Sequence, residues 1–116
     1  MTLKDDLEQF TGTTEYHKLS IFPVLATDGT AYFCEKAEAY WLFDKMAAIT
    51  MQHPEQAFIV CEVNSKDNKC TIKFQDGNYN YFCEKKIPYT DLPEGEWDFF
   101  ISNLPNQKVI LLPSEY

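Results

Sequence analysis

The sequence predicts a single α+β domain, an antiparallel β-sheet with one main helix packed on a face and a short helix at the N-terminus. Three observations predict it. The length of 116 residues suits one domain. Residues 37–52 repeat apolar side chains at helical spacing, and the chain after residue 56 alternates short apolar segments with turn residues. No linker or low-complexity segment divides the chain, so we expect one domain over residues 1–116.

A short helix is predicted over Leu3–Phe10, because Thr2 and Asp5 have the spacing of a capping box and Gly12 suits a helix end. Extended segments are expected next, over Glu15–Ile21 and Val24–Thr27. The dipeptide Asp28-Gly29 is typical of a tight turn, so the strand predicted at Thr30–Glu35 would complete a hairpin.

The main helix is predicted over Ala37–Gln52 and ends at His53-Pro54, since the residue before proline disfavours helix. Its apolar residues recur every three to four positions. They are Ala39, Leu42, Phe43, Met46 and Ile49.

Five strands are predicted after this helix. They are Ala57–Val63, Cys70–Phe74, Tyr79–Ile87, Glu96–Ser102 and Val109–Leu112. The pentapeptide Tyr32–Lys36 recurs unchanged at Tyr81–Lys85. Two copies do not make a repeat architecture, and we interpret them as a coincidence between two amphipathic strands.

Charge disfavours several partners. The chain has eighteen acidic residues and ten basic ones, all of them Lys, which gives a net charge of −8. Direct binding of nucleic acid or of an anionic membrane surface would need a positive face, so neither is expected. No apolar stretch has the length of a transmembrane helix or forms a secretion signal, and we expect a cytoplasmic protein.

The cysteines and histidines do not form a signature of chemistry. In the cytoplasm Cys34, Cys61, Cys70 and Cys83 would be free thiols, and none forms a C-x-x-C pair. Cys61 and Cys70 are symmetric about Ser65-Lys66, so a simple hairpin would place them opposite each other in the core, as buried thiols or as a redox pair. His17 and His53 are interpreted as bonded or solvated side chains. The four glycines are too scattered for a phosphate-binding loop, and we predict no catalytic residue, no metal and no cofactor.

The acidic residues are unevenly distributed. Residues 87–116 hold five acids and one Lys, half of the net charge. Glu94, Glu96 and Asp98 alternate at strand period and would share one face, with Asp91 just before them. This pattern predicts a negative patch for a basic protein surface, or an ordinary solvated strand face.

Trp41 is the other candidate binding residue. It lies between charged residues on a helical wheel, away from the apolar stripe, so we expect it to be partly exposed. The alternative is that the first helix covers it.

Five phrases in this order resemble a family of small single-domain bacterial, plasmid and phage proteins classed as a domain of unknown function. They are Phe10-Thr11-Gly12-Thr13 with Tyr16, Thr27-Asp28-Gly29, Ala39-Tyr40-Trp41-Leu42 with Asp44, Tyr89-Thr90-Asp91-Leu92-Pro93, and Leu112-Pro113-Ser114-Glu115-Tyr116. The resemblance implies an association with mobile elements. It supplies no catalytic residues.

We therefore expect a non-catalytic acidic interaction protein that binds a basic surface of a protein partner. The resemblance implies a host protein, either a defence component or a nucleic-acid-binding one. The alternative is a small enzyme or ligand-binding domain with an aromatic pocket between helix and sheet, lined by Tyr40 and Trp41.

Overall fold

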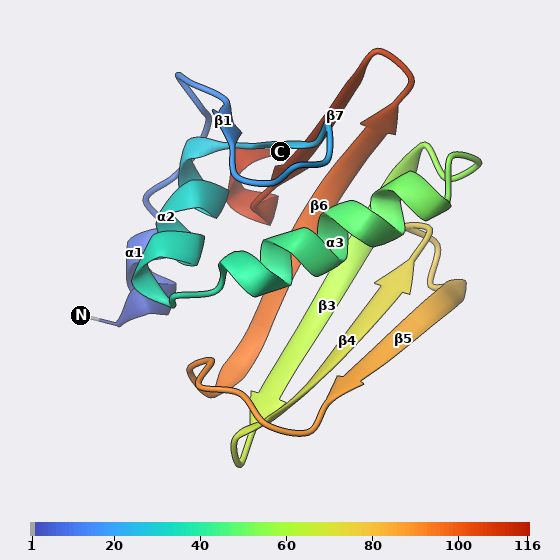
Figure 1. Cartoon of the computed structure of the whole chain (residues 1–116). Coiled ribbons are helices and arrows are strands. Elements are labelled where there is room, and N and C mark those ends of the chain that lie inside the picture. Colours follow the sequence, from blue (N-terminus) through green and yellow to red (C-terminus); the bar gives the residue numbers. More distant parts are fainter. Residues whose placement is uncertain (1) are drawn as a thin grey trace.

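In the computed structural model, residues 2–116 form one seven-stranded sheet with three α-helices (Figure 1). Met1 lies outside the described residues. The helices are α1 (Leu3–Leu7), α2 (Asp28–Lys36), α3 (Tyr40–Gln52) and a short 3-10 helix, η1 (Pro113–Glu115). The strands are β1 (His17–Lys18), β2 (Leu25–Ala26), β3 (Phe58–Lys66), β4 (Lys69–Gln75), β5 (Tyr81–Ile87), β6 (Gly95–Leu104) and β7 (Gln107–Leu111).

The strands are ordered β1-β2-β7-β6-β3-β4-β5 across the sheet. All neighbours are antiparallel except β2 and β7, which are parallel. The α+β class and the mostly antiparallel sheet are thus confirmed. The last strand, β7, joins the two short N-terminal strands to the long central ones.

The two faces of the sheet differ. Figure 1 shows α3 running across one face, which we call the inner face. There the Asn103 side chain of β6 donates to the backbone oxygens of Thr50 (3.2 Å) and His53 (3.0 Å) at the end of α3. The inner-face residues of β3 and β6 belong to one core cluster with the buried residues of α3. The opposite, outer face carries the alternate, partly exposed residues of the same strands.

The hairpin predicted around Asp28-Gly29 is wrong, because residues 28–36 form helix α2. The Thr27 hydroxyl caps this helix by accepting from the Thr30 amide, and Asp28 provides an acidic first turn that suits the helix dipole. The strands expected at 15–21 and 24–27 shrink to the two-residue β1 and β2.

The repeated pentapeptide therefore adopts two structures. Tyr32–Lys36 is helical in α2, whereas Tyr81–Lys85 is extended in β5. The interpretation of both copies as strands is wrong for the first copy. Five identical residues carry too weak a preference to decide between helix and strand, and their surroundings decide instead.

Both predicted helices are shorter than expected. α3 begins at Tyr40 rather than Ala37, because Glu38 has a positive φ of 51° that interrupts the helical backbone. α1 ends at Leu7, although its predicted capping box of Thr2 and Asp5 is confirmed. The buried residues of α3 include Leu42, Phe43, Met46 and Ile49 from the predicted stripe.

The five strands predicted after residue 56 are present, but the first hairpin has a different register. Its turn is Asp67-Asn68, where φ values of 54° and 60° suit a two-residue hairpin turn. In this register Cys61 is the cross-strand partner of Phe74, and Cys70 is the cross-strand partner of Ser65. The prediction that the two cysteines lie opposite each other is wrong, although both are buried on the inner face.

Candidate functional site

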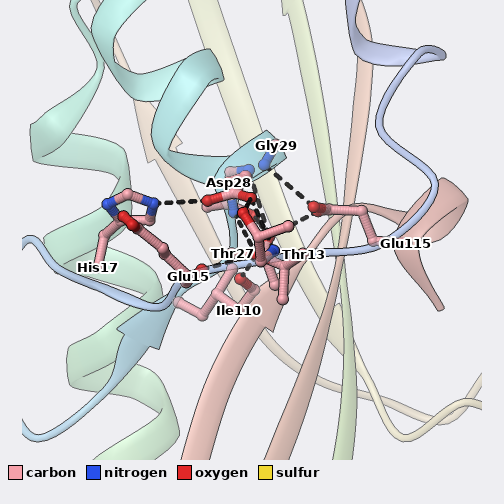
Figure 2. Close-up of polar contacts among 10 residues, drawn as sticks. Thr13, Glu15, His17, Thr27, Asp28, Gly29, Ile110 and Glu115 are labelled. Atoms are coloured by element: carbon pink, nitrogen blue, oxygen red, sulfur yellow. Dashed lines mark hydrogen bonds and ion pairs between the residues drawn. The ribbon is translucent and has the colours of Figure 1, made fainter.

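A carboxylate network surrounds the N-terminus of α2 (Figure 2). Glu115, from η1, accepts three hydrogen bonds. Its donors are the Thr27 hydroxyl (2.6 Å), the Gly29 amide (3.0 Å) and the Leu112 amide (3.0 Å). Gly29 allows this close approach, because an added Cβ would lie 2.6 Å from a Leu112 methyl group and 2.8 Å from a Glu115 oxygen. The C-terminal segment is thereby anchored to α2.

Asp28 makes the second half of the network. Its carboxylate accepts from the Thr14 amide (2.9 Å) and hydroxyl (3.0 Å), and the other oxygen lies 2.8 Å from Nε2 of His17. The Thr13 hydroxyl accepts from the Asp28 amide and donates to the Glu15 carbonyl (Figure 2). The hydrogen bond from the Thr14 backbone amide, followed by the contact with His17, lowers the pKa of Asp28 below its ordinary value. Asp28 thus stays ionised and holds residues 13–17 against α2.

The anchored C-terminus places Tyr116 beside the outer face of the sheet. Its ring centroid lies 5.7 Å from that of Phe58 on β3 and 5.4 Å from that of Phe100 on β6. The two phenylalanine rings are 5.3 Å apart. These three rings line a concavity of about 470 Å³ together with Glu62 and Asp98, and we call it the aromatic pocket.

A second concavity adjoins this pocket on the outer face and shares Glu62 and Asp98 with it. We call it the acidic groove; its volume is about 460 Å³. Three carboxylates line it: Glu62 of β3 and Glu96 and Asp98 of β6. Glu62 and Asp98 are direct cross-strand partners, and Lys73 is the one basic residue in the lining.

The carboxylates of the acidic groove are not equivalent. Glu62 accepts from the Gln75 side-chain amide (2.6 Å) and from the Tyr81 hydroxyl (2.9 Å). Among residues 2–116, no group donates a hydrogen bond to the Asp98 carboxylate. Partial desolvation, followed by repulsion from Glu62 and Glu96, raises the pKa of Asp98, and the smaller opposing effect of the Lys4 ammonium does not cancel this rise. A cation at this position would relieve that repulsion.

The five predicted binding residues lie in three places: two in the acidic groove, two in another groove, and one, Glu94, outside both. Glu96 and Asp98 lie together in the acidic groove, opposite the buried inner-face residues of β6, as their alternation predicts. Glu94 precedes β6 and accepts from the Asp67 amide (3.1 Å) at the β3–β4 turn, so it does not belong to the strand face.

Trp41 and Asp91 meet at another site, near the start of α3. Both line a groove of about 310 Å³ with Tyr89, whose hydroxyl donates to Asp91 (3.2 Å). Trp41 is partly exposed, which confirms its predicted position outside the apolar stripe. Tyr40 is exposed and does not line this Trp41 groove.

Sequence reasoning missed Glu62 and the aromatic pocket. The signal for Glu62 was present, because apolar Ile59, Cys61 and Val63 alternate with it and so assign it to the opposite face. Its pairing with Asp98 depends on strand register, which the sequence does not reveal. Tyr116 belongs to the family-like phrase Leu112–Tyr116, but the sequence predicts no neighbour for its ring.

The thiols fit a structural role. All four cysteines are free; Cys34, Cys61 and Cys70 are buried and Cys83 is partly buried. Burial raises the pKa of all three buried thiols, to about 12 for Cys34. Within residues 2–116, no three His, Cys, Asp or Glu side chains are placed to share a metal ion. No helix in that range is long and apolar enough to cross a membrane.

No curated protein matches the chain. A crystal structure of a protein of unknown function from Enterococcus faecalis is similar, with a TM-score of 0.56 and 17% sequence identity. The similarity covers 88% of this chain and 98% of that one, and at this identity it concerns the fold alone. The family described as "Family of unknown function (DUF6876)" matches residues 1–116, which confirms the resemblance to a family of unknown function, and the chain belongs to that family.

Proposed function

We propose that the chain is a non-catalytic interaction protein whose outer sheet face binds a basic surface of a protein partner. The observation that carries this proposal is the acidic groove, where Glu62, Glu96 and Asp98 line one concavity beside the aromatic pocket. Charged residues beside apolar rings are a common composition for a surface that binds another protein.

Charge supports a basic partner. The net charge of −8 attracts cationic surfaces over a distance, and the acidic groove would align them once they arrive. Nucleic-acid-binding proteins present such surfaces, and we place the partner among host proteins of this class, including defence components. The free thiols agree with a cytoplasmic setting for the interaction.

The test compares two variants with the same change in charge. The first, Glu62→Gln/Glu96→Gln/Asp98→Asn, neutralises the acidic groove. The matched control, Glu35→Gln/Glu55→Gln/Asp44→Asn, neutralises three exposed acids elsewhere. Each immobilised protein captures partners from host lysate at about 50 mM and about 500 mM salt, because screening weakens exposed charge contacts.

We expect a basic protein that the wild-type chain and the control retain at low salt and that the groove variant loses. Single exposed charges contribute about 0–1 kcal/mol, so only the triple change gives a clear loss. Equal retention by the groove variant, or capture by wild type of no basic protein, would overturn the proposal. Melting curves of all three proteins verify that each is folded.

The second candidate is a small-ligand-binding domain, and the Trp41 groove supports it. This candidate predicts that Trp41→Ala removes ligand binding, while the triple variant of the acidic groove binds the ligand as wild type does. Thermal shift with a metabolite panel, run on both variants, separates the two candidates.

A further inference from the structure

We propose that the aromatic pocket receives an arginine side chain of the partner, with its guanidinium paired to Asp98 and stacked on the rings of the pocket. This inference rests on the proposed function and deepens it, because it names the group that the outer face recognises.

Four aromatic residues from separate parts of the chain line the pocket, and they are Phe58, Tyr79, Phe100 and Tyr116. Phe58 and Phe100 lie on neighbouring strands, and their rings meet at an interplanar angle of 62°. Tyr116 packs edgewise against both, yet 82% of the residue remains exposed. A ligand can therefore reach its ring. Aromatic faces attract cations through the ring quadrupole, and guanidinium groups stack on them more readily than ammonium groups do.

The acidic side of the pocket is prepared for a cation. Glu62 is held by the Gln75 amide and the Tyr81 hydroxyl, and it faces Asp98 across the strand pair. No donor within residues 2–116 occupies the Asp98 carboxylate, so both of its oxygens are free to accept a bidentate pair. Planar, two-point pairing with a carboxylate is a property of arginine that lysine lacks.

The position of Tyr116 in the pocket has an identifiable source. Glu115 ties the C-terminal segment to α2 through the Thr27 hydroxyl and the Gly29 amide, and the next residue is Tyr116. The wall is thus positioned before a ligand arrives, which lowers the entropic cost of binding. A second copy of this chain is not the occupant, because the sequence contains no arginine.

The test uses a defined probe and needs no identified partner. Isotope-labelled protein is titrated with N-acetyl-arginine N-methylamide and, separately, with the lysine analogue, while amide chemical shifts are followed by NMR. We expect saturable shifts around residues 58–62, 98–100 and 116 with an arginine dissociation constant of order millimolar, and at least threefold weaker binding of lysine. Equal binding of both probes, or no shifts in these segments, would overturn the inference.

Variants test the two halves of the pocket. Tyr116→Ala, at an exposed position, and Asp98→Asn should each weaken the arginine probe at least threefold. Tyr16→Ala and Asp44→Asn are the matched controls, since they remove an exposed ring and an exposed carboxylate outside the acidic groove and the aromatic pocket, and both should bind as wild type. Unchanged probe binding by Tyr116→Ala or by Asp98→Asn would refute the pocket.

The outcomes for the pocket and for the proposed function can be distinguished. If the groove variant loses the basic partner while the arginine probe gives no shifts, the proposed function holds and the arginine inference fails. If the probe binds through Tyr116 and Asp98 while the groove variant keeps its partner, the pocket is an arginine site but the proposed function is wrong.

Discussion

Glu115→Ala is expected to destabilise the fold, because one carboxylate connects the C-terminal segment to the start of α2. The substitution removes the acceptor of three hydrogen bonds, from the Thr27 hydroxyl, the Gly29 amide and the Leu112 amide. The hydroxyl has a substitute acceptor, since it also lies 3.5 Å from the Ile110 carbonyl. The two amides have no such substitute within residues 2–116, and water would have to reach them.

The expected magnitude follows from these two amides. A hydrogen bond to a charged acceptor contributes about 1.5–3 kcal/mol, and Glu115 is only partly buried, so we use the lower end for each amide. The loss for Glu115→Ala is then about 3 kcal/mol. Glu115→Gln keeps one acceptor oxygen and should cost about 1–2 kcal/mol.

Urea unfolding measures this loss. Trp97 is 5% exposed in the core, so its fluorescence reports on global unfolding. With a slope of about 1–3 kcal/mol per molar urea, the midpoint should fall by about 1 M or more for the alanine variant. Glu35→Ala, at an exposed position on α2, is the control and should change stability by less than about 0.5 kcal/mol.

A change below about 0.5 kcal/mol for Glu115→Ala would refute this reasoning, because it would mean that water replaces the carboxylate without loss. A double-mutant cycle with Thr27→Val gives an independent measure. The two residues share a 2.6 Å hydrogen bond, so a coupling energy of about 0.5 kcal/mol or more is expected.

Three further predictions concern the core, the thiols and pH. Leu42→Ala and Met46→Ala, at fully buried positions, should each cost about 2–5 kcal/mol in urea unfolding and partly exposed Trp41→Ala clearly less; the reverse order would contradict the described packing. Alkylation without reductant should modify four thiols in unfolded protein, and in native protein Cys83 should react first because the other three are buried with raised pKa values; two blocked thiols would contradict this. Because the folded protein has a lowered pKa at Asp28, this carboxylate stabilises the fold at pH values above its ordinary pKa of 3.8, and the stabilisation is lost as the pH falls through the folded pKa. Asp98 has a raised pKa in the folded protein, so its effect is opposite: the stability of the fold falls as the pH rises from 3.8 through the folded pKa. Melting temperatures between about pH 2 and 7 should therefore fall less steeply in acid for Asp28→Asn, and should be higher at neutral pH for Asp98→Asn than for wild type; the opposite signs would contradict the two shifts.

The strands were predictable because their information is local. Ile59, Cys61 and Val63 alternate with more polar neighbours, and Trp97, Phe99 and Ile101 do the same on β6. Such alternation assigns a face without any knowledge of the fold. Burial of the α3 stripe was predictable for the same reason, since Leu42, Met46 and Ile49 follow the helical period.

The N-terminal half was less predictable because its structure depends on distant residues. Asp28-Gly29 has the composition of a turn, yet it begins a helix that Glu115 stabilises from 86 residues away. The candidate site has the same character. Its acidic half could be predicted from the alternation of Glu96 and Asp98, but Glu62 and Tyr116 join it through strand register and the anchored C-terminus. Neither the strand register nor the position of the C-terminal segment can be predicted from the residues that neighbour Glu62 and Tyr116 in the sequence.

The position of β7 has a consequence for the order of folding. β2 pairs with β7, and the Gly29 amide at the start of α2 donates to Glu115, so β2 and α2 find these partners only when residues 107–115 are in place. Central strands β3 to β6 can pair earlier, because each contacts a near neighbour in the chain or closes one moderate loop. In pulsed hydrogen exchange during refolding, we expect protection of β3 and β4 amides before those of β2 and α2. Gly29 and Glu115 lie 86 residues apart in the chain, so α2 takes its native place only when this long loop closes, which makes its docking a late step of folding.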